Sequence, residues 1–180
     1  MKKLRELLLI RHAKSDWKQS QDLLDIERPL AEKGKKQAKK IGLWLKQQEI
    51  FPDLILVSPA IRAQQTLKRI CSECPTETRT VDELYNADLE TLIKTLSTTP
   101  KKAERVMLIG HNPGLEELFQ YLKSDRTPSE IQLFPTASIA HFILPGDWSH
   151  LEAGDGKLQQ FVRPKEIHLK KLEQATAIQA

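Results

Sequence analysis

A short aliphatic run near the start of the chain constrains the fold most strongly. Leu7–Ile10 is four aliphatic residues without a polar break, and it leads directly into Arg11 and His12. Such a run predicts a short, fully buried strand. Open α/β sheets bind ligands at the carboxyl ends of their strands, so the charged Arg11 and the imidazole of His12 stand where a ligand would be held.

The rest of the chain alternates similar strand segments with helical ones. Strands are expected at 4–10, 53–57, 76–81, 105–109 and 138–144, with 157–162 returning as the hairpin partner of the fifth. Helices are expected after each of the first four strands. This order predicts an α/β fold: a three-layer α/β/α sandwich with a mostly parallel, mixed central sheet.

Residues suited to a first helical turn mark the expected helix starts. Pro29 fits the first turn of the first helix, and Ser58 is expected to be the N-cap of the second, with Pro59 at its first position. That second helix is expected to run to about Ser72. Asp88 is expected to cap the third.

The length and net charge of the chain limit the number of domains and the classes of binding partner. The 180 residues fit one domain, placed at 1–164, with a charged tail at 165–180. The net charge of +4 favours an anionic substrate, but no basic block with interleaved aromatic residues predicts nucleic-acid binding. No apolar run approaches the roughly 18 residues of a membrane span, and the first is too short for a signal peptide. We therefore expect a cytoplasmic monomer without a membrane partner.

The two cysteines, Cys71 and Cys74, form a C-x-x-C pair. A structural zinc site needs four ligands, and the chain has no second such pair. A thioredoxin-like pair would open a helix, whereas this one closes an expected helix. We interpret the pair as structural or incidental, and we expect neither a metal nor a cofactor.

Three predicted strands end in side chains suited to phosphate chemistry. Arg11 and His12 follow the first, Ser58 and Arg62 follow the second, and His111 follows the fourth. If these strands are neighbours, two histidines and two arginines meet beside helix N-termini, which attract anions. One histidine can act as nucleophile toward a phosphoryl group while the cations neutralise its oxygens. Two histidines without a carboxylate cluster make a poor metal site.

Four segments also carry a resemblance. They are Leu-Leu-Ile-Arg-His-Ala at 8–13, Arg-Pro-Leu-x-x-x-Gly at 28–34, Val-Ser-Pro-Ala-Ile-Arg-Ala-Gln-Gln-Thr at 57–66 and Leu-Ile-Gly-His-Asn-Pro-Gly-Leu at 108–115. In this order they resemble the signature blocks of the histidine phosphatase superfamily, which has the phosphoglycerate-mutase-like fold. The usual Arg-His-Gly is Arg-His-Ala here, and the small Ala13 makes this a minor departure.

The resemblance implies roles for individual residues. His12 would become a phosphohistidine intermediate, and Arg11, Arg62 and His111 would line the phosphate pocket. Arg28 would lie near its mouth as a substrate-binding residue, and Ser15 is a further candidate donor to substrate.

Within the superfamily the chain resembles the small SixA-type phosphohistidine phosphatases. The lid and insertions of mutases are missing, and a short Glu-Leu-Tyr-x-Ala block at 83–87 replaces their longer acid-bearing segment. Glu83 is the candidate general acid, with Asp82 and Asp88 as competitors. A phosphohistidine leaving group needs such an acid less, because it can depart already protonated on its second nitrogen.

Three functions are compatible with these residues. The leading one is a metal-independent phosphatase acting on phosphohistidine in a protein. The second is a phosphomonoesterase for sugar phosphates or other small esters, which a deep, lid-covered pocket would favour. The third is a non-catalytic phosphate-binding module, which would have no need of the nucleophile His12.

Overall fold

The computed structural model describes residues 4–18, 22–71, 75–123 and 133–167. In these residues the strands are β1 (Arg5–Arg11), β2 (Leu54–Val57), β3 (Glu77–Thr80), β4 (Arg105–Gly110), β5 (Ile139–Leu144) and β6 (Lys157–Val162). The α-helices are α1 (Glu32–Gln47), α2 (Ile61–Ile70), α3 (Leu89–Ser97) and α4 (Gly114–Leu122). Short 3₁₀ turns are η1 (Asp25–Glu27), η2 (Asp82–Leu84) and η3 (Pro164–Glu166).

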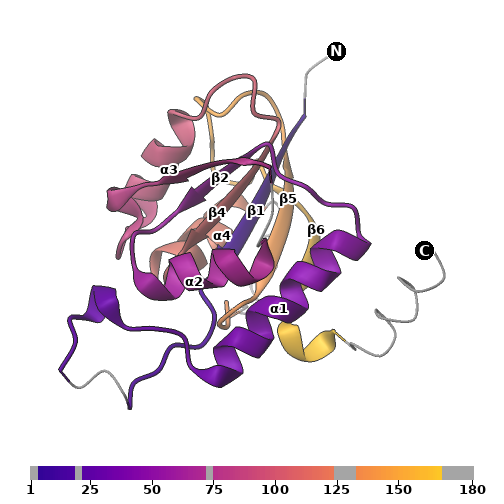
Figure 1. The fold of residues 1–180 in the computed structure, drawn as a ribbon. Helices are drawn as coiled ribbons and strands as arrows, with labels where there is room; N and C mark the ends of the chain where they lie inside the picture. The colour runs from indigo at the N-terminus through magenta and orange to yellow at the C-terminus, as the bar shows by residue number, and fades with distance from the viewer. Residues whose placement is uncertain (1–3, 19–21, 72–74, 124–132, 168–180) are drawn as a thin grey trace.

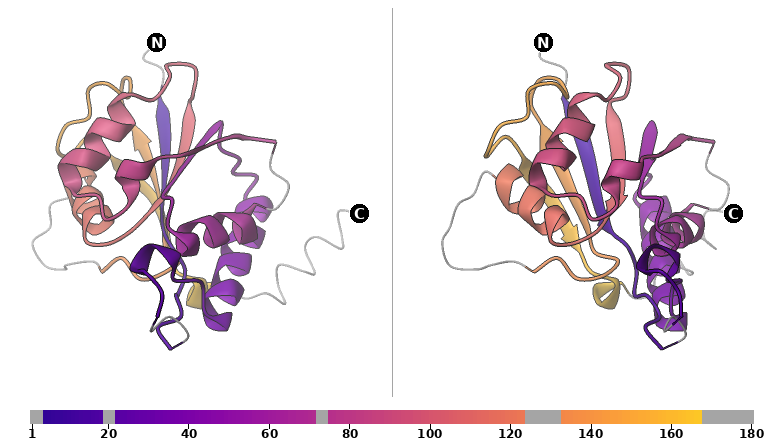
Figure 2. Two further views of the ribbon diagram at one scale, coloured as in Figure 1. Left: turned by 60° about the vertical axis from the view of Figure 1, so that its left-hand side comes forward. Right: turned by 90° about the vertical axis from the view of Figure 1, so that its left-hand side faces the viewer.

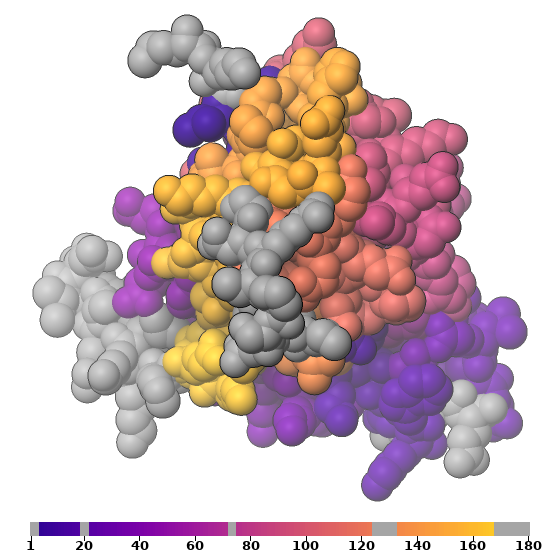
Figure 3. Space-filling model, turned by 180° about the vertical axis from the view of Figure 1, so that it is seen from behind, coloured from indigo at the N-terminus to yellow at the C-terminus, as the bar shows by residue number. Residues whose placement is uncertain are grey.

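The strands form one sheet in the order β3-β2-β4-β1-β5-β6. The first four in this order run parallel, β5 is antiparallel to β1, and β6 is antiparallel to β5. The sheet is therefore mixed and mostly parallel, as predicted. Seen from the back, the orange-to-yellow segment that contains β5 and β6 forms part of the surface (Figure 3).

Helices cover both faces of the sheet. Helices α1 and α2 lie on one face, and α3 and α4 lie on the other (Figures 1 and 2). Successive residues of a strand point to opposite faces, so Leu7 and Leu9 pack in the core beneath α3 and α4, while Leu8 and Ile10 pack beneath α1 and α2. All four are fully buried. This two-sided burial is why the middle of β1 is an unbroken aliphatic run, and it confirms the three-layer sandwich.

The register of the central strands positions the functional side chains. Arg11 of β1 pairs with Gly110 of β4, and Val57 of β2 pairs with Ile109 of β4. The three strands therefore end level with one another, and the residues that come next in the chain emerge at the same edge. The condition for the expected juxtaposition is therefore met, because β2, β4 and β1 are successive strands of the sheet.

Two helices begin later than expected. Pro29 accepts a hydrogen bond from the backbone N–H of Asp16 at 2.9 Å, and Ala31 donates one to Lys14 at 2.9 Å. These bonds hold residues 29–31 extended against the segment after β1, so α1 starts only at Glu32. The prediction of a helical turn at Pro29 was therefore wrong.

Ser58 is not the N-cap of α2. Its backbone N–H donates to Ile109 at 3.1 Å, which continues the sheet register past Val57, and Ala60 occupies the N-cap position instead. Asp88 does cap α3 as predicted, accepting a hydrogen bond from the backbone of Thr91.

The end of the described chain is packed on the domain. Turn η3 follows β6, and Ile167 is buried in the core beneath α1 and α2. Most of the expected tail lies outside the described residues, as does Cys74. Cys71 is the C-cap of α2, so this cysteine does close a helix. No helix in the described segments has the length and hydropathy needed to cross a membrane.

Candidate active site

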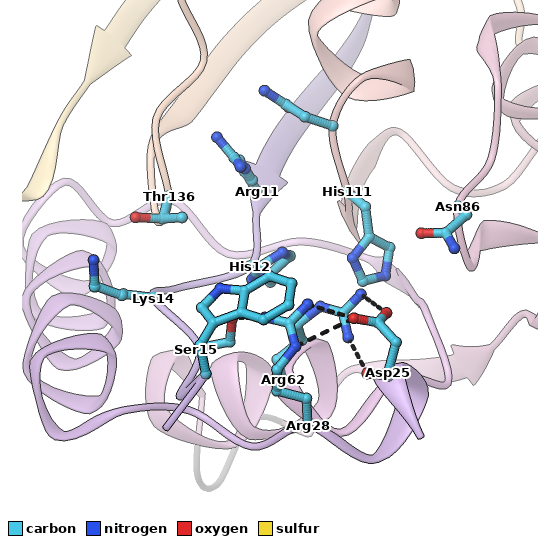
Figure 4. A pocket seen from close by; sticks show the side chains of 12 residues that line it. Arg11, His12, Lys14, Ser15, Asp25, Arg28, Arg62, Asn86, His111 and Thr136 are labelled. Atoms are coloured by element: carbon cyan, nitrogen blue, oxygen red, sulfur yellow. Dashed lines mark hydrogen bonds and ion pairs between the residues drawn. The ribbon is translucent and has the colours of Figure 1, made fainter. Parts of the chain in front are cut away.

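A cavity of about 450 Å³ opens at the carboxyl edge of β1, β2 and β4. It is lined by six of the residues predicted from the sequence: Arg11, His12, Ser15, Arg28, Arg62 and His111. Their side chains come from four separate segments and gather around one space (Figure 4). The expected juxtaposition of two histidines with arginines at one sheet edge is therefore present in the structure.

His12 is held rigidly at the floor of this cavity. Its backbone N–H donates to Gly110 at 3.1 Å, and its side chain is buried. The ring Nδ1 lies 2.8 Å from the carbonyl oxygen of Ala13. Because a carbonyl can only accept, Nδ1 carries the hydrogen, and Nε2 keeps a free lone pair. This tautomer presents Nε2 as a nucleophile.

Arg62 is the most deeply buried cation of the site. It comes from the first turn of α2 and is only 3% exposed. Its Nη1 donates to the backbone oxygen of Asp25 at 2.6 Å, and its Nη2 donates to the Asp25 carboxylate at 2.9 Å. Its Nε is buried and has no partner among the described residues. The guanidinium is thus anchored at one end and retains an unused donor.

Arg28 and Arg11 supply the other positive charges. Arg28 donates from Nε and Nη2 to the Asp25 carboxylate and from Nη1 to the hydroxyl of Ser15. The indole of Trp17 stacks on its guanidinium at 3.7 Å. Arg11 donates to the backbone oxygen of Phe134 at 2.9 Å. Three arginines therefore line the cavity that contains His12, a charge arrangement that favours a phosphoryl group.

Asp25 is a site residue that the sequence reasoning missed. It accepts hydrogen bonds from Arg28, from Arg62 and from the hydroxyl of Tyr85, the last at 2.8 Å. Burial alone would raise its pKa, but the bonds from Arg28 and Tyr85 and the charge of Arg62 hold that pKa well below its usual range. The carboxylate therefore stays ionised and fixes two arginines at once. An acidic residue three positions before the Arg-Pro-Leu block was the available signal.

The two histidines are neutral in this environment. Burial, followed by the charge of nearby Arg62, lowers the pKa of His12 from the ordinary value of 6.5 to about 4, although its bond to Ala13 opposes this. Burial and the neighbouring His12 and Arg62 lower the pKa of His111 to about 3. The ring centroids of the histidines are 5.0 Å apart. Neutral rings can approach this closely without charge repulsion, and a neutral His12 is the nucleophilic form.

We expect His12 to titrate far below an ordinary histidine. A pKa lowered by folding means that the unfolded chain binds the proton first, so the free energy of unfolding should fall as the pH drops from about 6.5 toward 4. NMR titration of the His12 ring signals, assigned with His12→Asn, should show no midpoint above pH 5. A midpoint near 6.5 would contradict this electrostatic description.

The predicted acid, Glu83, does not line this cavity. It borders a separate cavity of about 310 Å³ between the sheet and α3, together with Arg79 and Thr91. The segment after β3 instead contributes Asn86 to the pocket in front of His12. The alternatives Asp82 and Asp88 also lie outside the pocket lining, at η2 and at the cap of α3. The carboxylate that does line it is Asp25.

Known proteins that are similar in sequence point to the same phosphate chemistry as the geometry of the cavity. Residues 7–123 match the family model of the histidine phosphatase superfamily (branch 1). An uncharacterized protein of Mycobacterium tuberculosis is 32% identical over 162 residues, which are 87% of this chain and all of the relative. The phosphohistidine phosphatase SixA of Escherichia coli is 28% identical over 152 residues, which are 82% of this chain and 88% of the relative.

A solved structure extends the similarity to three dimensions. The protein histidine phosphatase SixA complexed with tungstate superposes with a TM-score of 0.74 at 26% identity, covering 91% of this chain and 99% of that one. The match of the family model covers well over half of the sequence and includes His12, Arg62 and His111. The chain is a member of the histidine phosphatase superfamily.

Proposed function

We propose that the protein removes the phosphoryl group from phosphohistidine in another protein, through a covalent phosphohistidine on His12. One observation carries the proposal: the bond from His12 Nδ1 to Ala13 leaves Nε2 unprotonated in a cavity that three arginines line. A module that only binds phosphate gains nothing from a nucleophile held in this way. The similarity to SixA proteins, one of them complexed with the oxyanion tungstate, supports the same reading.

The reaction proceeds in two transfers. In the first, the lone pair of His12 Nε2 attacks phosphorus, a new N–P bond forms, and the N–P bond of the substrate breaks. The leaving imidazole keeps the electron pair of that bond and departs neutral because its second nitrogen already carries a proton. In the second transfer, water attacks phosphorus and an O–P bond forms while the N–P bond to His12 breaks. The electron pair of that bond returns to Nε2, the protons of the water leave with the released phosphate, and neutral His12 is regenerated. Arg11, Arg28 and Arg62 neutralise the phosphoryl oxygens in both.

The side chains that line the pocket suit a phosphohistidine substrate. It offers guanidinium groups to the phosphoryl oxygens, while the carboxylates considered as general acids lie elsewhere. An imidazole leaving group tolerates that arrangement better than an alkoxide, which must take a proton as it leaves. At the mouth, the side chain of Trp17 is 70% exposed and available to a macromolecular substrate.

The test compares substrates on one enzyme preparation. We expect kcat/KM for a phosphohistidine-bearing protein to exceed that for each member of a panel of sugar phosphates and other small phosphate esters by at least about tenfold, equivalent to about 1.4 kcal/mol. A higher kcat/KM for a small ester would transfer the function to a small-molecule phosphatase. Absence of turnover on every compound, with phosphate still bound, would favour a binding module.

Removal of metal ions should leave activity intact. The cavity is dominated by guanidinium groups, and its carboxylate, Asp25, is already bonded to Arg28, Arg62 and Tyr85. A divalent cation would have to compete with those arginines for its only acidic ligand in the lining. Hydrolysis rates measured before and after EDTA treatment should agree. A loss that magnesium or zinc restores would refute the metal-free mechanism.

A further inference from the structure

His111 contacts the polar side chain of Ser58, which has no role in the two transfers described above. Its Nε2 lies 2.7 Å from the hydroxyl oxygen of Ser58, and both side chains are buried. Ser58 follows β2 and His111 follows β4, so the paired strands place the two side chains together. The same hydroxyl oxygen accepts a hydrogen bond from the backbone N–H of Ala60 at 3.3 Å.

The direction of the Ser58–His111 bond follows from counting donors and acceptors. A serine hydroxyl has one hydrogen to donate and two lone pairs. Ser58 is fully buried, so its hydrogen must find an acceptor inside the protein. The N–H of Ala60 is itself a donor, and among the described residues the remaining partner of the hydroxyl is His111 Nε2. Ser58 therefore donates to Nε2.

This direction determines which nitrogen of the neutral ring carries the proton. With Nε2 acting as acceptor, the hydrogen of His111 lies on Nδ1. That nitrogen is buried and has no hydrogen-bond partner among the described residues. An unpaired buried N–H is costly unless a ligand satisfies it. The ring stands 5.0 Å from that of His12 and lines the same cavity (Figure 4).

We propose that Ser58 is a positioning residue that fixes His111 as the Nδ1–H tautomer, so that this N–H donates to a phosphoryl oxygen transferred to His12. The inference rests on the proposed function. In the opposite tautomer, Nδ1 would direct a lone pair at the phosphoryl oxygens and repel them. A fixed donor aimed at the transferring group is the kind of preorganised contact that stabilises a transition state.

The tautomer can be read directly, without substrate. In full-length protein labelled with ¹⁵N-histidine at neutral pH, we expect His111, assigned with His111→Gln, to be protonated on Nδ1. In Ser58→Ala, Nε2 loses its donor, and the ¹⁵N chemical shifts of the His111 ring should move toward the values of a mixture of the two tautomers. Ser138→Ala is the matched control, because Ser138 is also fully buried and its hydroxyl has no partner among the described residues. That variant should keep the wild-type tautomer.

Activity gives the second readout. Ser58→Ala should lower kcat by roughly tenfold, with little change in KM. This is less than the roughly 100- to 1,000-fold that direct loss of a transition-state donor costs, because His111 itself remains. Ser138→Ala should keep the wild-type kcat. Wild-type His111 protonated on Nε2, or an unchanged tautomer in Ser58→Ala, would refute the proposal. A wild-type enzyme inactive on every phosphate compound would instead refute the proposed function, since the NMR result does not depend on turnover.

Discussion

Replacing His12 by asparagine should lower kcat/KM on the order of 10⁴-fold or more, because the variant has no nucleophile to accept the phosphoryl group. Asparagine is smaller than histidine and polar, so it can occupy the floor of the pocket without burying a charge. The three arginines remain, and the variant should still bind inorganic phosphate. Steady-state kinetics on a phosphohistidine-bearing protein, with phosphate binding measured by calorimetry, checks both expectations. Turnover within tenfold of wild type would remove His12 from the reaction.

Replacing Arg62 by alanine should lower kcat/KM by roughly 30- to 1,000-fold, equivalent to about 2–4 kcal/mol of lost transition-state stabilisation. The guanidinium is buried beside both histidines, and its Nε still lacks a partner among the described residues. The phosphoryl oxygens should supply that partner. The measurement is kcat/KM for the same substrate, together with the thermal midpoint of each variant.

A matched control lies on the same helix. Arg69 is an exposed arginine of α2, two turns beyond Arg62, and Arg69→Ala removes the same side chain outside the cavity. It should leave kcat/KM unchanged. If both variants lost activity equally, or if Arg62→Ala kept wild-type kcat/KM while folded, Arg62 would not contact the transferring group.

The strands and their ends were predictable because a strand that is buried on both faces requires consecutive apolar residues. β1 and β4 are covered on both faces, so each contains an unbroken apolar run of four residues, and the first polar residue after that run marks the sheet edge. The same reasoning predicts that Arg11, His12 and His111 lie at one edge of the sheet. Helix starts were less predictable, because backbone pairing outside the helix decided them, as at Pro29 and Ser58.

Sequence reasoning missed Asp25 and assigned Ser58 and Glu83 to other roles or places than the structure gives them. Asp25 stands in a polar segment with no hydrophobic period, and its importance follows from Arg62 and Tyr85, which are 37 and 60 positions away. The Pro59 that follows Ser58 is typical of a helix start, so Ser58 was interpreted as a helix cap. Its observed partner, His111, is 53 positions away and could not be inferred from the neighbouring sequence. Glu83 was chosen because its block stands in place of the longer acid-bearing segment of mutases, and the turn η2 places it in a different cavity.

The covalent intermediate on His12 is tested most directly by trapping it. The enzyme is quenched in alkali during turnover of a substrate labelled in the phosphoryl group, and the label is mapped after digestion. A phosphoramidate is stable in base and labile in acid. We predict base-stable, acid-labile label on the peptide that contains His12, absent in His12→Asn and still detectable in His111→Gln. Label on the His111 peptide, or no label while water attacks the substrate phosphorus directly, would contradict the account.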